Sequence, residues 1–185
     1  MNKAIFLDRD GTINTDKQYL YKISDFELSP GVVEGLKLLQ SKGFILIIIT
    51  NQSGIGRGYY SEEDFLNLNA WMVDYLMQKG IRISKVYYCP HHPNAIIGRY
   101  RKKCNCRKPA LGMYEKAVRE YGINLAESYT IGDKIRDCAI CEKTNCRGYL
   151  ISTNEKKSII NDVIDGKYTR IKYKNNLLEA ALDIQ

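Results

Sequence analysis

Short apolar runs alternate with amphipathic segments along the chain. Residues 4–7 are apolar and lead directly into Asp-Arg-Asp-Gly-Thr, which predicts a buried strand that ends at a polar turn. Residues 44–49 are continuously apolar and rich in β-branched side chains, as expected for a central strand covered on both faces. Three further short strands are predicted over 86–88, 129–131 and 148–152.

The segments between these strands have helical spacing and recognisable ends. Pro30 suits the first turn of a helix, and Gly43 suits the position just after its last turn. Ser61 precedes three acidic residues, a pattern typical of a helix N-terminus. The predicted helices cover 30–43, 61–76, 109–121, 135–144 and 176–184, whereas the charged stretch 154–176 has no assigned role. Strand and helix alternation of this kind favours an α/β fold with a doubly wound, mainly parallel sheet that binds ligands at the carboxyl ends of its strands.

Length and composition narrow the class of protein. The 185 residues favour one domain over 1–185. The apolar run at 44–49 is too short to cross a bilayer, and the N-terminus lacks a secretory pattern. We therefore expect a cytoplasmic protein without a membrane partner, in which the six cysteines are metal ligands or buried thiols.

The net charge of +7 arises in the second half of the chain. Residues 1–98 hold ten basic and ten acidic side chains, whereas residues 99–185 hold 18 basic and 11 acidic ones. This asymmetry favours nucleic acid, an anionic surface or a phosphorylated substrate as partner, without choosing among them.

Two carboxylates follow the first predicted strand. Asp8 and Asp10 are two residues apart at a turn, so both can reach one crevice. Such a pair can hold Mg²⁺, and one member can attack phosphorus while the other transfers protons. The alternative interpretation is a helix-capping aspartate in a solvated turn.

Two other predicted strand ends carry complementary groups. Thr50 and the following Asn51-Gln52-Ser53 offer a hydroxyl and main-chain N–H groups to phosphoryl oxygens. Lys108 would offset the charge around phosphorus, and Asp133 would complete a metal site. We expect Asp137 to have a supporting role.

The segment 89–108 contains a candidate structural zinc site. Cys89 and His91, followed by Cys104 and Cys106, supply the thiolate and imidazole ligands that tetrahedral Zn²⁺ takes. His92 is an alternative to His91 because the two are adjacent. The remaining three cysteines, which have no fourth ligand nearby, are expected to be core thiols: Cys138, Cys141 and Cys146.

These motifs, in this order, resemble the signature motifs of the haloacid dehalogenase-like phosphohydrolases. The resemblance implies a Mg²⁺-dependent phosphatase with Asp8 as nucleophile and Asp10 as general acid and base. It also implies that Asp8, Asp10 and Asp133 hold the magnesium, and that Thr50 and Lys108 hold the transferring oxygens.

Residues 4–150 further resemble the D-glycero-D-manno-heptose-1,7-bisphosphate 7-phosphatase family, on Asp8-Arg9-Asp10-Gly11-Thr12, the run from Thr50 to Gly58, and the cysteine–histidine segment. That resemblance implies removal of the C7 phosphate in nucleotide-activated heptose biosynthesis, no separate cap domain, and a zinc loop beside the substrate. It places a sugar contact on Asp16 to Tyr19, where Lys17-Gln18 stand in place of an expected glycine. Arg107 and Lys134 are placed to bind the second phosphate or the sugar hydroxyls.

Two other functions fit parts of the sequence. Histidinol-phosphate phosphatases share the carboxylate pair and a similar zinc loop, but the basic residues around 99–108 suit a doubly anionic sugar better than a cationic amino alcohol. A zinc-loop nucleic-acid binder would fit the positive charge and the tyrosines near it, yet it leaves the acidic cluster unexplained. We therefore expect a small-molecule substrate, no nucleic-acid partner and a monomer.

Overall fold

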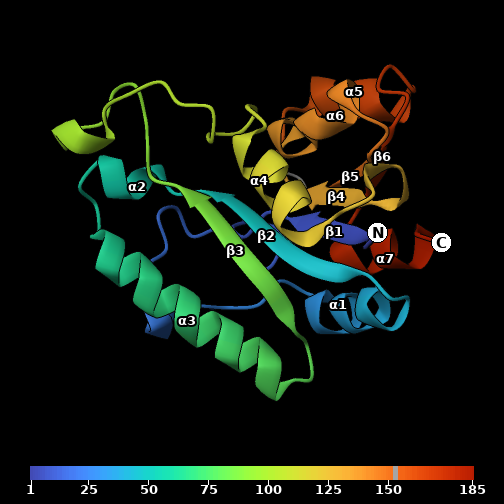
Figure 1. Cartoon of the computed structure of the whole chain (residues 1–185), viewed down its shortest axis with the longest axis horizontal. Helices are drawn as coiled ribbons and strands as arrows, with labels where there is room; N and C mark the ends of the chain where they lie inside the picture. The colour runs from blue at the N-terminus through green and yellow to red at the C-terminus, as the bar shows by residue number, and fades with distance from the viewer. Residues whose placement is uncertain (152–153) are drawn as a thin grey trace.

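A computed structural model describes residues 1–151 and 154–185, and these residues form a six-stranded sheet. All five neighbouring pairs of strands are parallel. The strands are β1 (Ala4–Leu7), β2 (Ile45–Asn51), β3 (Ile83–Cys89), β4 (Tyr129–Gly132), β5 (Arg147–Ile151) and β6 (Ile171–Lys174). Their order is β3-β2-β1-β4-β5-β6, so the direction of winding reverses at β1 (Figure 1). A crevice outside the carboxyl end of β1 is therefore the expected ligand site.

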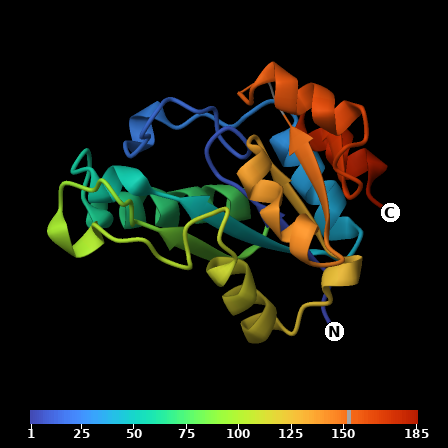
Figure 2. The same ribbon diagram turned by 90° about the horizontal axis from the view of Figure 1, so that it is seen from above.

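Helices cover both faces of this sheet (Figures 1 and 2). They are α1 (Val32–Ser41), α2 (Ser53–Gly56), α3 (Glu62–Gln78), α4 (Gly112–Tyr121), α5 (Ala139–Lys143), α6 (Lys157–Ile164) and α7 (Leu177–Asp183). Short 3₁₀ turns occur at Ile23–Asp25, Gly98–Tyr100, Leu125–Glu127 and Ile135–Cys138. Apolar side chains of α1, α3 and α7 pack on one face, and those of α4, α5 and α6 pack on the other.

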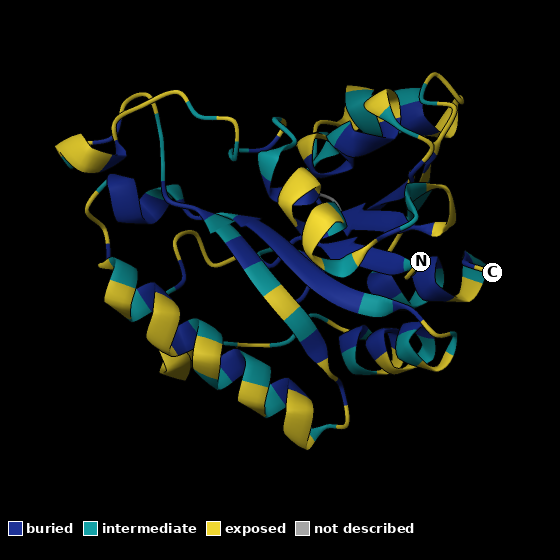
Figure 3. Ribbon diagram, viewed as in Figure 1, coloured by how far each residue is buried: buried dark blue, intermediate teal, exposed yellow. Residues whose placement is uncertain are grey.

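Alternation along β1 explains why its sequence is entirely apolar. Ile5 and Leu7 belong to the core shared with α1, α3 and α7, whereas Ala4 and Phe6 belong to the core shared with α4 to α6. All four side chains are fully buried, and Figure 3 shows the central strands as buried along nearly their whole length. A strand with apolar neighbours on both faces gains no benefit from polar positions.

The helix ends follow the predicted chemistry. Ser61 Oγ accepts a hydrogen bond from the Asp64 N–H at 3.0 Å, and the Asp64 carboxylate accepts one from the Ser61 N–H at 2.8 Å. This reciprocal capping box fixes the start of α3. Gly122 ends α4 in the left-handed conformation, with φ of 58°.

Several predicted boundaries shift in the structure. The helix expected from residue 109 begins at Gly112, and the one expected from Pro30 begins at Val32. The segment 135–144 divides into a 3₁₀ turn and α5. The predicted strand 148–152 begins at Arg147, and its last residue, Ser152, lies outside the described residues.

The stretch 154–176, to which the sequence assigned no role, contains α6 and β6. The sheet thus has one more strand than the hydrophobic pattern indicated. Within the described residues, no helix is both long and apolar enough to cross a membrane.

Candidate active site

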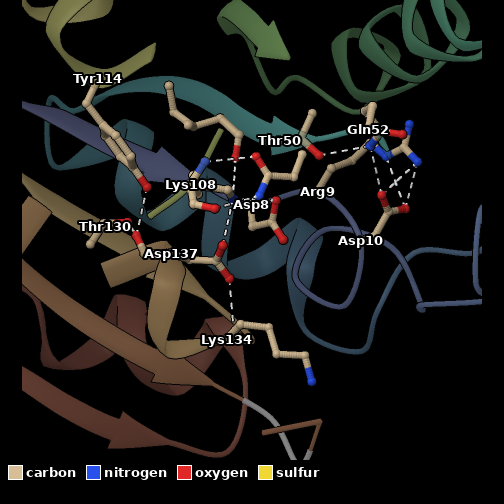
Figure 4. Close-up of polar contacts among 12 residues, drawn as sticks. Asp8, Arg9, Asp10, Thr50, Gln52, Lys108, Tyr114, Thr130, Lys134 and Asp137 are labelled. Carbon is tan, nitrogen blue, oxygen red and sulfur yellow. Dashed lines mark hydrogen bonds and ion pairs between the residues drawn. The ribbon is translucent and has the colours of Figure 1, made fainter. Parts of the chain in front are cut away.

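A buried ion-pair cluster lies at the carboxyl ends of β1 and β4 (Figure 4). The Lys108 ammonium lies 2.8 Å from the Asp8 carboxylate and 2.7 Å from that of Asp137. It also donates a hydrogen bond to the Ile49 carbonyl at 2.6 Å. These contacts use the three N–H donors of an ammonium group and fix Lys108 beside the side chain predicted to be the nucleophile.

Asp137 is held in this cluster from its other side. Its main-chain carbonyl accepts hydrogen bonds from the Tyr114 and Thr130 hydroxyls, at 2.7 and 2.8 Å. Its carboxylate accepts a further bond from the Lys134 N–H at 3.0 Å. Asp137, for which a supporting role is predicted, therefore directly contacts the lysine that contacts Asp8.

Asp133 brings a third carboxylate to the same place. Ligand oxygens of Asp8, Asp133 and Asp137 all lie within 4.8 Å of one another, and all three residues are buried. Burial, reinforced by Asp137, raises the pKa of Asp8 to about 6 despite the neighbouring Lys108. Burial, reinforced by Asp8 and Asp137, raises the pKa of Asp133 to about 8. Three acids against one lysine leave an excess of negative charge that a hard cation would offset.

Two glycines are required for this close approach. A Cβ atom on Gly11 would lie 2.5 Å from an Asp133 carboxylate oxygen, and one on Gly132 would lie 2.3 Å from the Asp137 Cβ. Gly11 also has φ of +81°, which L side chains rarely adopt. The close packing of Asp133 thus explains why a glycine, Gly11, follows Asp10 in the sequence.

Asp10 lies outside that cluster and has its own partners. Its carboxylate accepts hydrogen bonds from the Arg9 guanidinium at 2.7 Å, from Asn14 at 3.1 Å and from Gln52 at 3.0 Å. Burial alone would raise the pKa of Asp10, but the Arg9 charge and these hydrogen bonds lower it. Arg9 is itself 1% exposed, so its guanidinium is committed to this interaction.

A chain of hydrogen bonds continues from Asp10 to Tyr60. Gln52 Nε2 donates to Asp10 and, at 2.9 Å, to Thr50 Oγ1, while Gln52 Oε1 accepts from the Tyr60 hydroxyl at 2.6 Å. Thr50 and Gln52 are almost fully buried, so neither faces bulk water. The amide orientation of Gln52 is consequently fixed at both of its ends.

Asn51, predicted to contact phosphoryl oxygens, lies against Lys108. Its side-chain amide donates to the Lys108 carbonyl at 3.1 Å and its oxygen accepts from the Lys108 N–H at 3.0 Å. This pair of bonds ties the end of β2 to the segment that carries Lys108. Ser53, the first residue of α2, lies with Asn51 in the wall of an adjoining cavity.

That cavity has a volume of about 390 Å³ and contains Asp10 in its wall. Three arginines from separate segments line it, namely Arg57, Arg107 and Arg136. Arg107 also donates to the His91 carbonyl at 3.3 Å, which links the cavity to the cysteine–histidine segment. Converging guanidinium groups suit a second anionic group held away from the carboxylate cluster.

The segment Asp16 to Tyr19 forms another wall of this cavity, through Asp16, Gln18 and Tyr19. Gln18 and Tyr19 have φ of 53° and 61°, where the sequence departs from an expected glycine. Asp16 Oδ1 accepts a hydrogen bond from the Gln18 N–H at 2.9 Å. The Tyr19 ring packs edge-on against the Tyr59 ring, with 4.5 Å between the ring centroids. This turn holds Tyr19 at the rim of the cavity.

Lys134 is the predicted substrate contact that the structure places elsewhere. Figure 4 shows its ammonium end directed away from Asp8 and Lys108, and Lys134 does not line the cavity that contains Asp10. Arg136, two residues later, occupies that position instead.

The cysteine–histidine segment forms a second compact cluster. Sulfur atoms of Cys89, Cys104 and Cys106 lie 3.2 to 3.5 Å apart, and His91 Nδ1 lies 3.3 Å from Cys106 Sγ. His92 faces away from it, with Nε2 3.1 Å from the Arg57 guanidinium and Nδ1 accepting from the Asn94 N–H. The geometry therefore selects His91 over His92 for the four-residue cluster.

The other cysteines are buried free thiols, as predicted. Cys138, Cys141 and Cys146 are each at most 1% exposed and pack in the core beneath α4 and α5.

Sequence reasoning missed Arg9, Arg57, Tyr60 and Arg136 as parts of the site. Arg57 lies within the run from Thr50 to Gly58, and Arg136 lies three residues after Asp133, so their positions in the sequence were a usable signal. Arg9 and Tyr60 act through buried hydrogen bonds, which leave no pattern in the sequence.

Comparison with known proteins gives a consistent result. A family model described as polynucleotide kinase 3 phosphatase matches residues 3–176. The D-glycero-beta-D-manno-heptose-1,7-bisphosphate 7-phosphatase of Haemophilus ducreyi is 41% identical over 175 residues, covering 88% of this chain and 95% of the relative. The D-glycero-alpha-D-manno-heptose-1,7-bisphosphate 7-phosphatase of Photorhabdus laumondii is 43% identical over 157 residues, covering 84% and 86%.

Among solved structures, the D,D-heptose 1,7-bisphosphate phosphatase from B. bronchiseptica, complexed with magnesium and phosphate, superposes with a TM-score of 0.78. It is 27% identical, and the match covers 97% of this chain and 96% of that one. Together with the parallel sheet and the carboxylate cluster, these matches confirm the predicted fold class. The chain belongs to the polynucleotide kinase 3 phosphatase family of haloacid dehalogenase-like phosphatases.

Proposed function

We propose that this protein removes the C7 phosphate of D-glycero-D-manno-heptose 1,7-bisphosphate through an aspartyl-phosphate intermediate. The observation that carries the proposal is the cluster of Asp8, Asp133 and Asp137 around Lys108, adjoined by a cavity with three arginines. The first element suits transfer of one phosphoryl group, and the second suits retention of another. The relatives from Haemophilus ducreyi and Photorhabdus laumondii carry names for this activity.

Asp8 is the proposed nucleophile. One of its carboxylate oxygens attacks phosphorus as the C7 oxygen of the sugar departs, so that the phosphoryl group passes to Asp8. Lys108 keeps the Asp8 carboxylate oriented and offsets charge on the transferring oxygens, and Thr50 contributes its hydroxyl. A water molecule then attacks the same phosphorus, which releases inorganic phosphate and restores Asp8.

Asp10 is the proposed general acid and base. It gives a proton to the departing C7 oxygen and takes one from the attacking water in the second step. Arg9, Asn14 and Gln52 hold it at the wall of the cavity and lower its pKa. We expect the negatively charged bisphosphate to raise that pKa on binding, because nearby negative charge favours the protonated carboxyl.

Magnesium is the proposed cofactor. Asp8 and Asp133 would hold it with the main-chain carbonyl of Asp10, and oxygen ligands in a cluster of buried acids fit a hard divalent cation. When bound, the cation neutralises negative charge on the phosphoryl oxygens. The solved phosphatase from B. bronchiseptica is complexed with magnesium and phosphate, which supports this assignment.

Zinc is the proposed structural ion of the segment 89–108. Three thiols and one imidazole nitrogen, with all ligand atoms within 4.8 Å, are the donor set of a closed tetrahedral site. Arg107 and Lys108 follow the last cysteine directly, so this loop positions the cations of the site.

The C1 phosphate is the proposed ligand of Arg57, Arg107 and Arg136. These guanidinium groups favour a bisphosphate over histidinol phosphate, whose second functional group is a cationic amine. Tyr19 and Asp16 would contact the sugar between the two phosphates.

The test is a phosphate-release panel with and without Mg²⁺. Its substrates are both anomers of the heptose bisphosphate, heptose 7-phosphate, histidinol phosphate and a 3′-phosphorylated oligonucleotide. We expect kcat/KM to be highest for a heptose bisphosphate, and we expect Asp8→Asn to abolish release while the variant remains folded. Higher kcat/KM for histidinol phosphate or for the oligonucleotide would reject the proposed substrate.

The contribution of the arginines is tested separately. Arg107→Ala should raise KM for the bisphosphate by about tenfold, the value of one lost charged hydrogen bond, and leave KM for heptose 7-phosphate nearly unchanged. Equal losses for both substrates would place Arg107 at the reacting phosphate instead.

A further inference from the structure

A second cavity, of about 540 Å³, lies at the amino-terminal ends of the strands, whereas the carboxylate cluster lies at their carboxyl ends. It is lined at the first residues of two parallel strands, Tyr129 of β4 and Arg147 of β5, and by residues around β6 and the end of α7. The carboxylate cluster follows the last residues of β1 and β4, so the sheet separates the two sites. Figure 1 shows α7 and both termini at the end of the sheet away from α2.

This cavity is positively charged and contains two arginines that lack acidic partners. Arg147, Arg170 and Lys172 line it together with one acid, Asp183. Asp183 is already paired, 2.9 Å from Lys172 and 3.3 Å from Lys174. Within the described residues, neither Arg147 nor Arg170 has a carboxylate within 4.0 Å. These two arginines take no part in the proposed reaction.

The two arginines are held in different ways. The Arg147 guanidinium lies over the Tyr129 ring, 4.6 Å from its centroid, and the residue is exposed. A guanidinium plane supported in this way can stack on a planar base. Arg170 donates one hydrogen bond to the Thr144 carbonyl at 3.0 Å, which orients its remaining N–H donors. Oriented guanidinium donors match phosphate oxygens.

We propose that this cavity binds a nucleoside phosphate. The base stacks on Arg147, and the phosphate oxygens contact Arg170 and Lys172. A cavity of this volume accommodates a ligand of that size, since small-molecule sites span roughly 300–1,000 Å³. The proposal is independent of the substrate proposed above, because it uses none of the residues around Asp8.

The test is calorimetric titration of the full-length protein with ADP, adenosine and pyrophosphate, in the Asp8→Asn background so that no probe is hydrolysed. ADP should bind more tightly than either part alone. Arg170→Ala and Arg147→Lys should each weaken ADP binding by about tenfold. The lysine at position 147 keeps the positive charge but lacks the planar guanidinium group on which the base stacks. Arg119→Ala, an exposed arginine on α4 outside the cavity, is the matched control and should leave binding unchanged.

Three results would overturn the proposal. ADP could fail to bind, pyrophosphate could bind as tightly as ADP, or Arg107→Ala could abolish ADP binding while the Arg147 and Arg170 variants retain it. The last result would place ADP in the cavity beside Asp10. When Asp8 is left unchanged, the Arg147→Lys and Arg170→Ala variants should retain full phosphatase activity. That activity would show that both variants fold.

Discussion

Replacing Tyr60 with phenylalanine tests whether the buried hydrogen-bond chain holds Asp10 in position. The Tyr60 hydroxyl donates to Gln52 Oε1 at 2.6 Å, and Gln52 donates onward to Asp10 and Thr50. Burial raises the pKa of Tyr60 well above its usual range, so the hydroxyl remains a donor at neutral pH. Tyr60→Phe keeps the ring and removes this single donor.

The expected loss follows from burial. Gln52 is 2% exposed, so water does not readily replace the missing donor to Oε1. A buried acceptor left unpaired costs about 1–3 kcal/mol, and we expect the free energy of unfolding to fall by that amount. Arg9 and Asn14 still hold Asp10, so kcat should fall by about tenfold, less than the roughly 10²- to 10⁴-fold value of an acid–base group.

The assay combines urea denaturation with phosphate release from the heptose bisphosphate. Tyr59→Phe is the matched control, because Tyr59 is the neighbouring tyrosine and is 53% exposed. It should change the free energy of unfolding by less than about 0.5 kcal/mol. A double-mutant cycle with Gln52→Leu should give a coupling energy of about 0.5–3 kcal/mol. Wild-type stability and wild-type kcat in Tyr60→Phe would refute the positioning role of this chain.

Three further predictions concern other parts of the molecule. Gln18→Gly should stabilise the protein by about 0.5–1 kcal/mol in thermal or urea denaturation, because φ of 53° strains a side chain but not glycine; a destabilised variant would contradict this. Hydrogen bonds from Lys172 and Tyr149 lower the pKa of Asp183 to about 2, so its stabilisation is present above pH 4 and is lost as pH falls towards 2. Asp183→Asn should therefore cost about 1 kcal/mol near pH 6 after solvent screening and much less near pH 2, and a constant cost across that range would argue against the ion pair. Removing zinc with a chelator, or introducing Cys104→Ser, should lower the melting temperature, whereas metal analysis of fresh protein that finds no zinc would reject the assignment.

The central part of the fold could be predicted from the sequence because one requirement decides each residue type there, either burial in a strand or capping of a helix. β1 and β2 are apolar on both faces, and the Ser61 cap marks the start of α3. α6 and β6 escaped prediction because they are short and interrupted by charges. Lys172 and Lys174 alternate with Ile171 and Tyr173 along β6, which is the last strand of the sheet. Such lysines protect an edge strand from pairing with other chains, but they hide the strand from a hydrophobicity criterion.

The residues of the candidate site also divide into those that could be predicted from the sequence and those that could not. Asp8, Lys108 and Asp133 were predictable because they follow strand ends or a recognisable motif, and the structure brings them together. The second contact of Lys108, with Asp137, depends on how α4 and the turn after β4 pack, which local sequence does not specify. For the same reason the sequence pointed to Lys134, whereas the turn directs Arg136 into the cavity.

The most direct test of phosphoryl transfer to Asp8 is a crystal structure of the protein with Mg²⁺ and beryllium fluoride, which mimics a phosphoryl group on a carboxylate. We expect beryllium to be bonded to an Asp8 carboxylate oxygen, with Lys108 and Thr50 in contact with its fluorides. Beryllium fluoride bonded to Asp10 or Asp133, or held only by the arginines of the cavity, would contradict the proposed mechanism.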